Sequence, residues 1–109
     1  MDILIQANGV TLTEGVQSLI EEKIGRVEDL APRAVRARVR VRKVSARPSA
    51  RQYVVRVLVE IPGADLSAEE SGPDVISALD VVAGKIERRA RKRKTERLAR
   101  RTRTTRGRE

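Results

Sequence analysis

The spacing of hydrophobic residues changes several times along this chain, and each change marks a predicted element. Ile3, Ile5 and Ala7 alternate with the residues between them, which predicts a short first strand. Asn8-Gly9 is typical of the turn that ends such a strand. Thr11 or Thr13 is suited to cap a following helix, and the Thr11/Glu14 spacing permits a capping box.

The first helical stripe extends to about residue 30, and Pro32 ends the helical region. Its apolar residues recur at three- and four-residue spacings, which is the period of one helix face. They are Val16, Leu19, Ile20, Ile24 and Val27.

Strict alternation over residues 34–44 predicts the second strand, with valine and alanine on one side and arginine on the other. Residues 52–61 predict a third strand, and residues 66–70 a short, acidic fourth strand after the Pro62-Gly63 turn. The loop 43–51 between the second and third strands is long enough to suggest mobility. The expected inner faces comprise Val35, Ala37, Val39 and Val41, then Tyr53, Val55, Val57, Val59 and Ile61.

The last stretch, residues 72–101, is predicted to be a long helix with two different halves. Pro73 and Asp74 suit its start. Its second half, residues 85–94, holds seven Lys or Arg residues and one acid, so we expect it to be exposed. The apolar stripe of its first half comprises Val75, Leu79, Val82 and Ile86, with Ile76, Ala83 and Ala90 beside them.

The predicted element order is therefore β-α-β-β-β-α in an α+β fold. A four-stranded sheet packs under two helices on one face, in a layout like that of double-stranded-RNA-binding domains. The other face carries the arginines or is partly solvated. We assign residues 1–94 to a single domain and 95–109 to a fraying helix end and a basic, disordered tail.

Charge is segregated along the chain. Its overall net charge of +9 is the balance of two anionic and two cationic blocks. Residues 1–32 carry net −4 and 57–84 carry −6, whereas 33–56 carry +9 and 85–109 carry +10. Solvation alone accounts for many basic proteins, but segregation this sharp favours a polyanionic partner, most simply nucleic acid.

The second strand carries one cationic block as a ladder. Residues on one strand face repeat about every 6.6 Å, so its arginines form a row, with Arg56 of the third strand in the neighbourhood. An exposed sheet face using arginine for solubility and edge protection is the alternative. Four arginines without an intervening acid favour phosphate contact. The ladder is Arg36, Arg38, Arg40 and Arg42.

Composition argues against catalysis and secretion. There is no His and no Cys, and no phosphate-binding glycine loop or metal-ligand spacing is present. Acid pairs such as Glu69-Glu70 do not converge as a catalytic dyad. We therefore expect no enzyme activity and no cofactor or metal. The lack of Cys, of a signal-peptide pattern and of an apolar run long enough to span a membrane predicts a cytoplasmic protein without membrane contact.

Several segments together resemble the short ribosome hibernation-promoting factors and the ribosome-associated inhibitor, a family also called sigma-54 modulation proteins. They are a helix opening at Thr13-Glu14 and carrying Lys23, a strand ending in Pro62-Gly63, and the runs 74–80 and 85–88. These runs are similar to the family's aromatic-Ala-Ala-Ile-Asp and Lys-Leu-Glu-Arg segments. Ile76 stands where the family usually has Tyr, and Ser77 where it has its first Ala.

The resemblance implies a factor that binds the small ribosomal subunit and its rRNA in the channel for mRNA and tRNA, and competes with both. It would inhibit translation in stationary phase or stress by steric occlusion, with no small-molecule substrate, and we expect a monomer off the ribosome. By position it implies rRNA contacts at Lys23, Arg26, Lys85, Arg88 and Lys92. Charge and geometry add Arg89, Arg91, Arg93, Lys94 and the arginine ladder.

Two alternatives remain open at this point. One is a general double-stranded-RNA-binding module, since shape and phosphate recognition of an A-form helix suits a basic domain almost without aromatic residues. The other is a protein-interaction regulator of transcription, as the older family label suggests. Sequence does not decide between promotion of ribosome dimers and of inactive single ribosomes.

Overall fold

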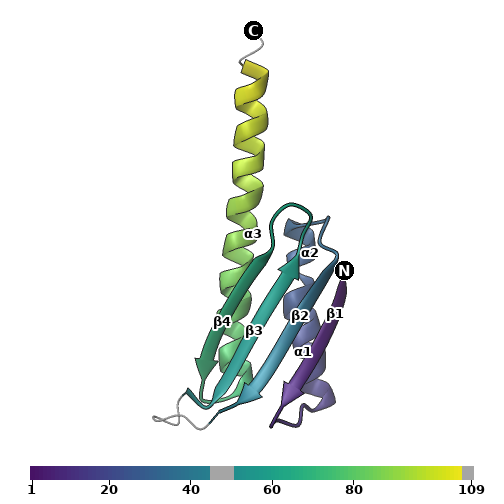
Figure 1. Cartoon of the computed structure of the whole chain (residues 1–109), viewed down its shortest axis with the longest axis vertical. Helices are drawn as coiled ribbons and strands as arrows, with labels where there is room; N and C mark the ends of the chain where they lie inside the picture. Colours follow the sequence, from purple (N-terminus) through teal and green to yellow (C-terminus); the bar gives the residue numbers. More distant parts are fainter. Residues whose placement is uncertain (45–50, 107–109) are drawn as a thin grey trace.

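In the computed structural model the backbone is described for residues 1–44 and 51–106, and side chains are described as far as residue 96. The predicted mobility of the 43–51 loop falls largely outside this part. A four-stranded sheet forms the front of the molecule, with its strands in the spatial order β1-β2-β3-β4 (Figure 1). The strands are β1 (Asp2–Asn8), β2 (Arg36–Lys43), β3 (Tyr53–Glu60) and β4 (Leu66–Gly72). The predicted α+β fold with four strands is thus confirmed.

Strand direction follows from the connections. β1 and β2 are parallel and joined through the helices α1 (Glu14–Gly25) and α2 (Val27–Leu30), whereas β2, β3 and β4 form an antiparallel meander. The Asn8-Gly9 and Pro62-Gly63 turns are both present. Gly9 (φ +71°) and Gly63 (φ +91°) occupy the left-handed region that favours glycine.

The N-terminal helical region is divided in two, where the hydrophobic stripe predicted one helix. α1 spans Glu14–Gly25 and α2 spans Val27–Leu30, with Arg26 between them. Glycine is unfavourable inside a helix, and the break after Gly25 still leaves Val27 completely buried. Of the two candidate caps, Thr13 serves: its hydroxyl accepts a hydrogen bond from Val16 N–H at 3.2 Å.

The long helix α3 (Val75–Arg106) lies behind the sheet beside α1 and continues beyond the sheet's end (Figure 1). Asp74 caps it by accepting a hydrogen bond from Ser77 N–H at 2.7 Å. The backbone is helical as far as Arg106, within the stretch that we expected to be a fraying helix end and a tail. No Gly or Pro occurs from residue 85 to 106 to interrupt the helix.

The core between sheet and helices is entirely aliphatic. Ile20 and Ile24 of α1 and Leu79, Val82 and Ile86 of α3 are completely buried against the valines of β2 and β3. No polar or charged residue is buried in the described part of the chain. All side chains of the predicted inner face of residues 55–61 are buried.

Two predicted core positions are wrong. Val35 is 54% exposed although it continues the alternation, because β2 begins only at Arg36. Ile76 is 44% exposed, because the buried stripe of α3 passes through Val75, Ala78 and Leu79 instead.

Candidate nucleic-acid interface

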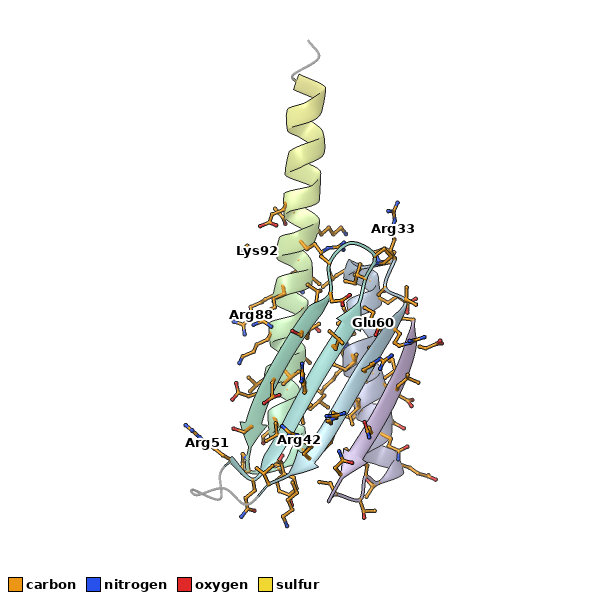
Figure 2. All side chains as sticks on the ribbon, viewed as in Figure 1. Arg33, Arg42, Arg51, Glu60, Arg88 and Lys92 are labelled. Carbon is orange, nitrogen blue, oxygen red and sulfur yellow. The ribbon has the colours of Figure 1, made fainter. Side chains whose placement is uncertain are left out.

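The second half of α3 presents a dense set of cations. Lys85, Arg88 and Lys92 follow at three- and four-residue spacings and therefore lie along one side of the helix. Arg88 and Lys92 are exposed and point away from the helix in Figure 2. Six cations from residue 88 onward form no ion pair with any described carboxylate: Arg88, Arg89, Arg91, Lys92, Arg93 and Lys94.

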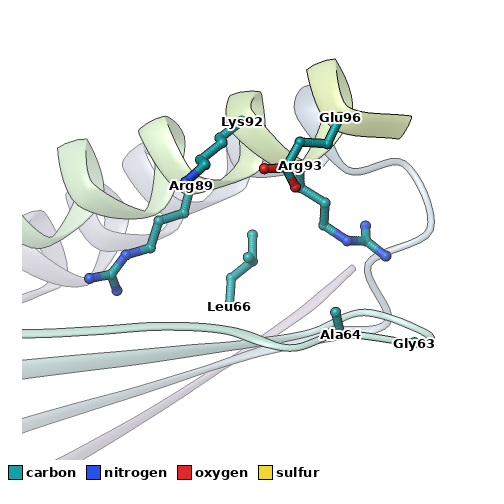
Figure 3. A pocket seen from close by; sticks show the side chains of 7 residues that line it. All are labelled: Gly63, Ala64, Leu66, Arg89, Lys92, Arg93 and Glu96. Carbon is teal, nitrogen blue, oxygen red and sulfur yellow. The ribbon is translucent and has the colours of Figure 1, made fainter. Parts of the chain in front are cut away.

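One of these arginines contacts β4 and another contacts the β3–β4 connection. Arg89 donates a hydrogen bond from Nη1 to the Ser67 carbonyl, and Arg93 donates from Nη2 to the Pro62 carbonyl at 3.2 Å. Both side chains reach from α3 toward the strands in Figure 3, around a cleft of about 540 Å³ that Lys92 and Leu66 also line. These contacts hold the basic part of α3 against the end of the sheet.

Lys85 is engaged at the edge of β4. Its Nζ lies 2.6 Å from Glu70 Oε2, and both side chains are about one third exposed. The hydrogen bond from Lys85 lowers the pKa of Glu70, and hydrogen bonding by Ser71 N–H lowers it further. A phosphate that approached Lys85 would therefore meet a carboxylate that is already bound to it.

The α1 cations are paired as well. Lys23 Nζ lies 2.5 Å from Asp80 Oδ1 and so joins α1 to α3, while Arg26 Nη2 lies 3.3 Å from Glu22 Oε1 in the preceding turn. Arg26 and Glu22 are more than half exposed. Exposed pairs of this kind contribute little to stability and exchange partners readily.

The arginine ladder lies on the face of the sheet that no helix covers, as expected. Its residues have unequal surroundings. Glu60 lies 3.5 Å from Arg36 and 3.1 Å from Arg38, and Glu69 lies 3.9 Å from Arg42. Among the described residues, the side chain of Arg40 has one hydrogen-bond partner, the neutral Gln6 Oε1 at 3.5 Å.

Most of the sequence-predicted cations occupy two surfaces, whereas Lys23 and Arg26 belong to the α1 region. Lys85, Arg88, Arg89 and Lys92 belong to the β4 side of α3, and the ladder belongs to the helix-free sheet face. Sequence reasoning did not identify the acids Glu60, Glu69, Glu70 and Asp80 as partners of these cations. Cross-strand register and helix packing create these pairs, and neither is visible in the order of residues along the chain.

The described part of the chain also bears on metal binding and on membrane crossing. It contains no cluster of three or more His, Cys, Asp or Glu residues that could hold a metal ion. None of its helices has the length and apolar character needed to cross a membrane.

Comparison with known families identifies the family of this chain. Residues 3–98 match the model of the family described as Sigma 54 modulation protein / S30EA ribosomal protein. The chain belongs to this family. It is 33% identical over 94 residues to a ribosome hibernation promotion factor of Staphylococcus aureus, and 31% identical over 91 residues to one of Deinococcus radiodurans. Each match covers 84% of this chain but only 47% and 48% of the relative, so the chain spans about half the length of these curated relatives.

Solved structures share the fold at lower identity. The N-terminal domain of Protein Y from Thermus thermophilus superposes with a TM-score of 0.72 at 18% identity, over 84% of this chain and 98% of the other. A ribosomal subunit interface protein from Coxiella burnetii gives 0.75 at 20% identity, over 87% and 99%. The family model and the two curated relatives confirm the family resemblance drawn from the sequence, and the solved structures confirm its fold.

Proposed function

We propose that this protein is a cytoplasmic ribosome hibernation factor, without enzyme activity, that binds the rRNA of the small subunit in the mRNA and tRNA channel. It would inhibit translation by occupying that channel. Family membership and the names of its relatives support an association with ribosomes. The site and mode of binding are our proposal.

The observation that carries the proposal is the basic run on α3. Seven cations in ten residues include six without a carboxylate partner among the described residues, and most of them are exposed. Arginine and lysine on a rigid helix make charge-assisted hydrogen bonds to phosphate oxygens without prior rearrangement. The aliphatic core holds the first half of the helix, so that the second half is presented in a fixed direction.

The paired cations have a different role in this proposal. Lys23 and Lys85 would bind rRNA only by sharing or exchanging their carboxylate partners, Asp80 and Glu70. Arg88 and Lys92, which lack such partners, would contribute most of the binding.

Competition with tRNA tests occlusion directly. Labelled initiator tRNA is bound to mRNA-programmed small subunits, and the full chain is titrated while retained tRNA is measured by filter binding. We expect tRNA to be displaced, and pre-bound tRNA to weaken binding of this protein by the same factor, because linkage is reciprocal. Simultaneous binding with neither ligand affecting the other would exclude occlusion.

A general double-stranded-RNA-binding module is the second candidate. One observation favours it: the cationic surfaces carry no aromatic residue for base stacking, which suits recognition of phosphates and shape. Sedimentation separates the candidates, since a ribosome factor co-sediments with small subunits in the presence of excess duplex RNA. A transcription regulator would sediment with neither.

A further inference from the structure

The helix-free face of the sheet holds two arginines that directly oppose each other. Arg40 of β2 and Arg56 of β3 are cross-strand partners, and both are exposed. Side chains in such a pair have Cβ atoms about 5 Å apart, and like charges there are destabilising. Neither arginine forms an ion pair with a described carboxylate.

The neighbouring charges make this pair distinctive. Glu69 is the cross-strand partner of Arg56 on the other side, yet its carboxylate contacts Arg42 instead. Glu60 pairs with both Arg36 and Arg38 at the far end of the ladder and offsets one of their two charges. The positive charge of the sheet face is therefore concentrated at Arg40 and Arg56.

Space for a ligand exists on both sides of the pair. A recess of about 200 Å³ between β1 and β2 is bordered by Arg40, Arg38, Leu4 and Gln6. A second hollow of about 310 Å³ begins at Arg56 and passes Ser67 and Glu69 at the β4 edge, where Lys85 and Arg89 also line it. This second hollow connects the sheet face with the basic part of α3.

We propose that Arg40 and Arg56 form a second phosphate-binding site, which holds an RNA backbone that continues from α3 over the edge of β4. This proposal deepens the proposed function, on which its ribosomal context rests. A phosphate between the two guanidinium groups replaces their repulsion by two charge-assisted hydrogen-bonded pairs. Arg89, which lies between the two surfaces, continues the cationic path from α3 to the sheet.

The test compares two double variants that remove equal charge from the same face. Arg40→Gln/Arg56→Gln removes the two arginines without an ion pair to a described carboxylate, and Arg36→Gln/Arg38→Gln removes the two that pair with Glu60. Binding is measured between about 50 and 200 mM salt, with vacant small subunits as one probe and an RNA duplex of about 16 base pairs as the other. Arg36→Gln/Arg38→Gln also takes both arginine partners away from the Glu60 carboxylate, which then repels RNA more strongly. This control can therefore only overstate the binding lost with two paired arginines, so a larger loss in Arg40→Gln/Arg56→Gln is a strict result.

We expect Arg40→Gln/Arg56→Gln to reduce the magnitude of the slope of log K against log salt by about 1.4–1.8, which corresponds to two lost phosphate contacts. The control should change it by less than half as much. The first variant should also unfold at the same or a higher temperature than the wild type, because a like-charge pair is removed. A slope change no larger than that of the control on both probes would overturn the proposal.

A third variant separates this proposal from the proposed function. Arg88→Gln/Lys92→Gln tests α3 in the same assays. If it loses subunit binding while Arg40→Gln/Arg56→Gln behaves like the control on both probes, the sheet-face site is refuted and the hibernation proposal stands. If the wild type binds only the duplex, and Arg40→Gln/Arg56→Gln reduces that slope, the phosphate site is supported and the ribosomal role fails.

Discussion

Lys23 of α1 and Asp80 of α3 lie in direct contact, with 2.5 Å between Nζ and Oδ1. The pair joins two helices that are far apart in sequence, beside a surface to which we assign RNA binding. A carboxylate at this point stabilises the position of the lysine and at the same time repels phosphate. The two side chains that join α1 to α3 are therefore also expected to affect RNA binding.

Replacing Asp80 by Asn should strengthen binding to small subunits, because Lys23 keeps its charge while a repelling carboxylate is removed. The stability cost should be below about 1 kcal/mol, as for other partly exposed pairs. Binding at fixed salt and thermal unfolding measure the two effects. Asp29→Asn is the control, since this exposed acid forms no ion pair with a described residue. Weaker binding by Asp80→Asn would mean that Lys23 needs Asp80 to hold it in position.

Substituting Arg88 and Lys92 together by Ala should weaken ribosome binding and leave the free energy of unfolding within about 0.5 kcal/mol of the wild type. Both side chains are exposed, and Arg88 makes only a backbone contact, to Gly84 O at 3.3 Å. Urea unfolding and subunit binding are measured on the same preparation. Marked destabilisation would assign these residues to the fold.

Val82 and Val81 provide a matched pair for the core of α3. Val82 is completely buried and Val81 is 44% exposed, although the two are adjacent. Val82→Asp should destabilise the domain by about 3–5 kcal/mol, since it buries an unpaired charge, and should unfold much of the population. Val81→Asp should remain folded by circular dichroism. Equal behaviour of both variants would contradict the assigned orientation of the helix.

Glu70 should give stability a specific dependence on acid pH. Its pKa is lowered in the folded state by Lys85 and Ser71 N–H, so its contribution is present above 4.5, the ordinary value for this group, and is lost as pH falls through the folded pKa. Wild type should therefore lose stability below about pH 4.5 more steeply than Glu70→Gln, as measured by thermal unfolding across pH. Parallel pH profiles would show that the Lys85 contact does not persist in solution.

Truncation tests the proposed domain, residues 1–94. The last buried core residue of the described part is Ala90, so a chain ending at Lys94 should unfold cooperatively and retain most subunit binding. A chain ending at Ile86 also loses Ala90 and the six cations between residues 88 and 94, and should be less stable and bind poorly. Loss of binding on removal of residues 95–109 alone would assign an essential role to that segment.

Sequence periodicity predicted the fold well where burial is one-sided. β2 and β3 have valine on every second position, so only one register buries them, and the structure adopts it. Periodicity failed at Val35, which lies just before β2 begins, and at Ile76, which lies on α3 beside the buried stripe of Val75, Ala78 and Leu79. The candidate site was predicted as a set of cations only. Glu60 reaches two arginines across a strand pair, and such long-range pairing depends on the assembled sheet.

The purely aliphatic interior bears on how such a chain can change over evolutionary time. Because no buried side chain in the described part carries a polar group, the interior restricts neighbouring positions only through volume and apolar pattern. Charged residues outside it are free to be gained, lost or exchanged without a correlated change inside. Solved structures with the same architecture at 18% and 20% identity are what this separation permits. Surface chemistry in this fold can therefore diverge under selection for binding alone, with little opposition from the requirement to fold.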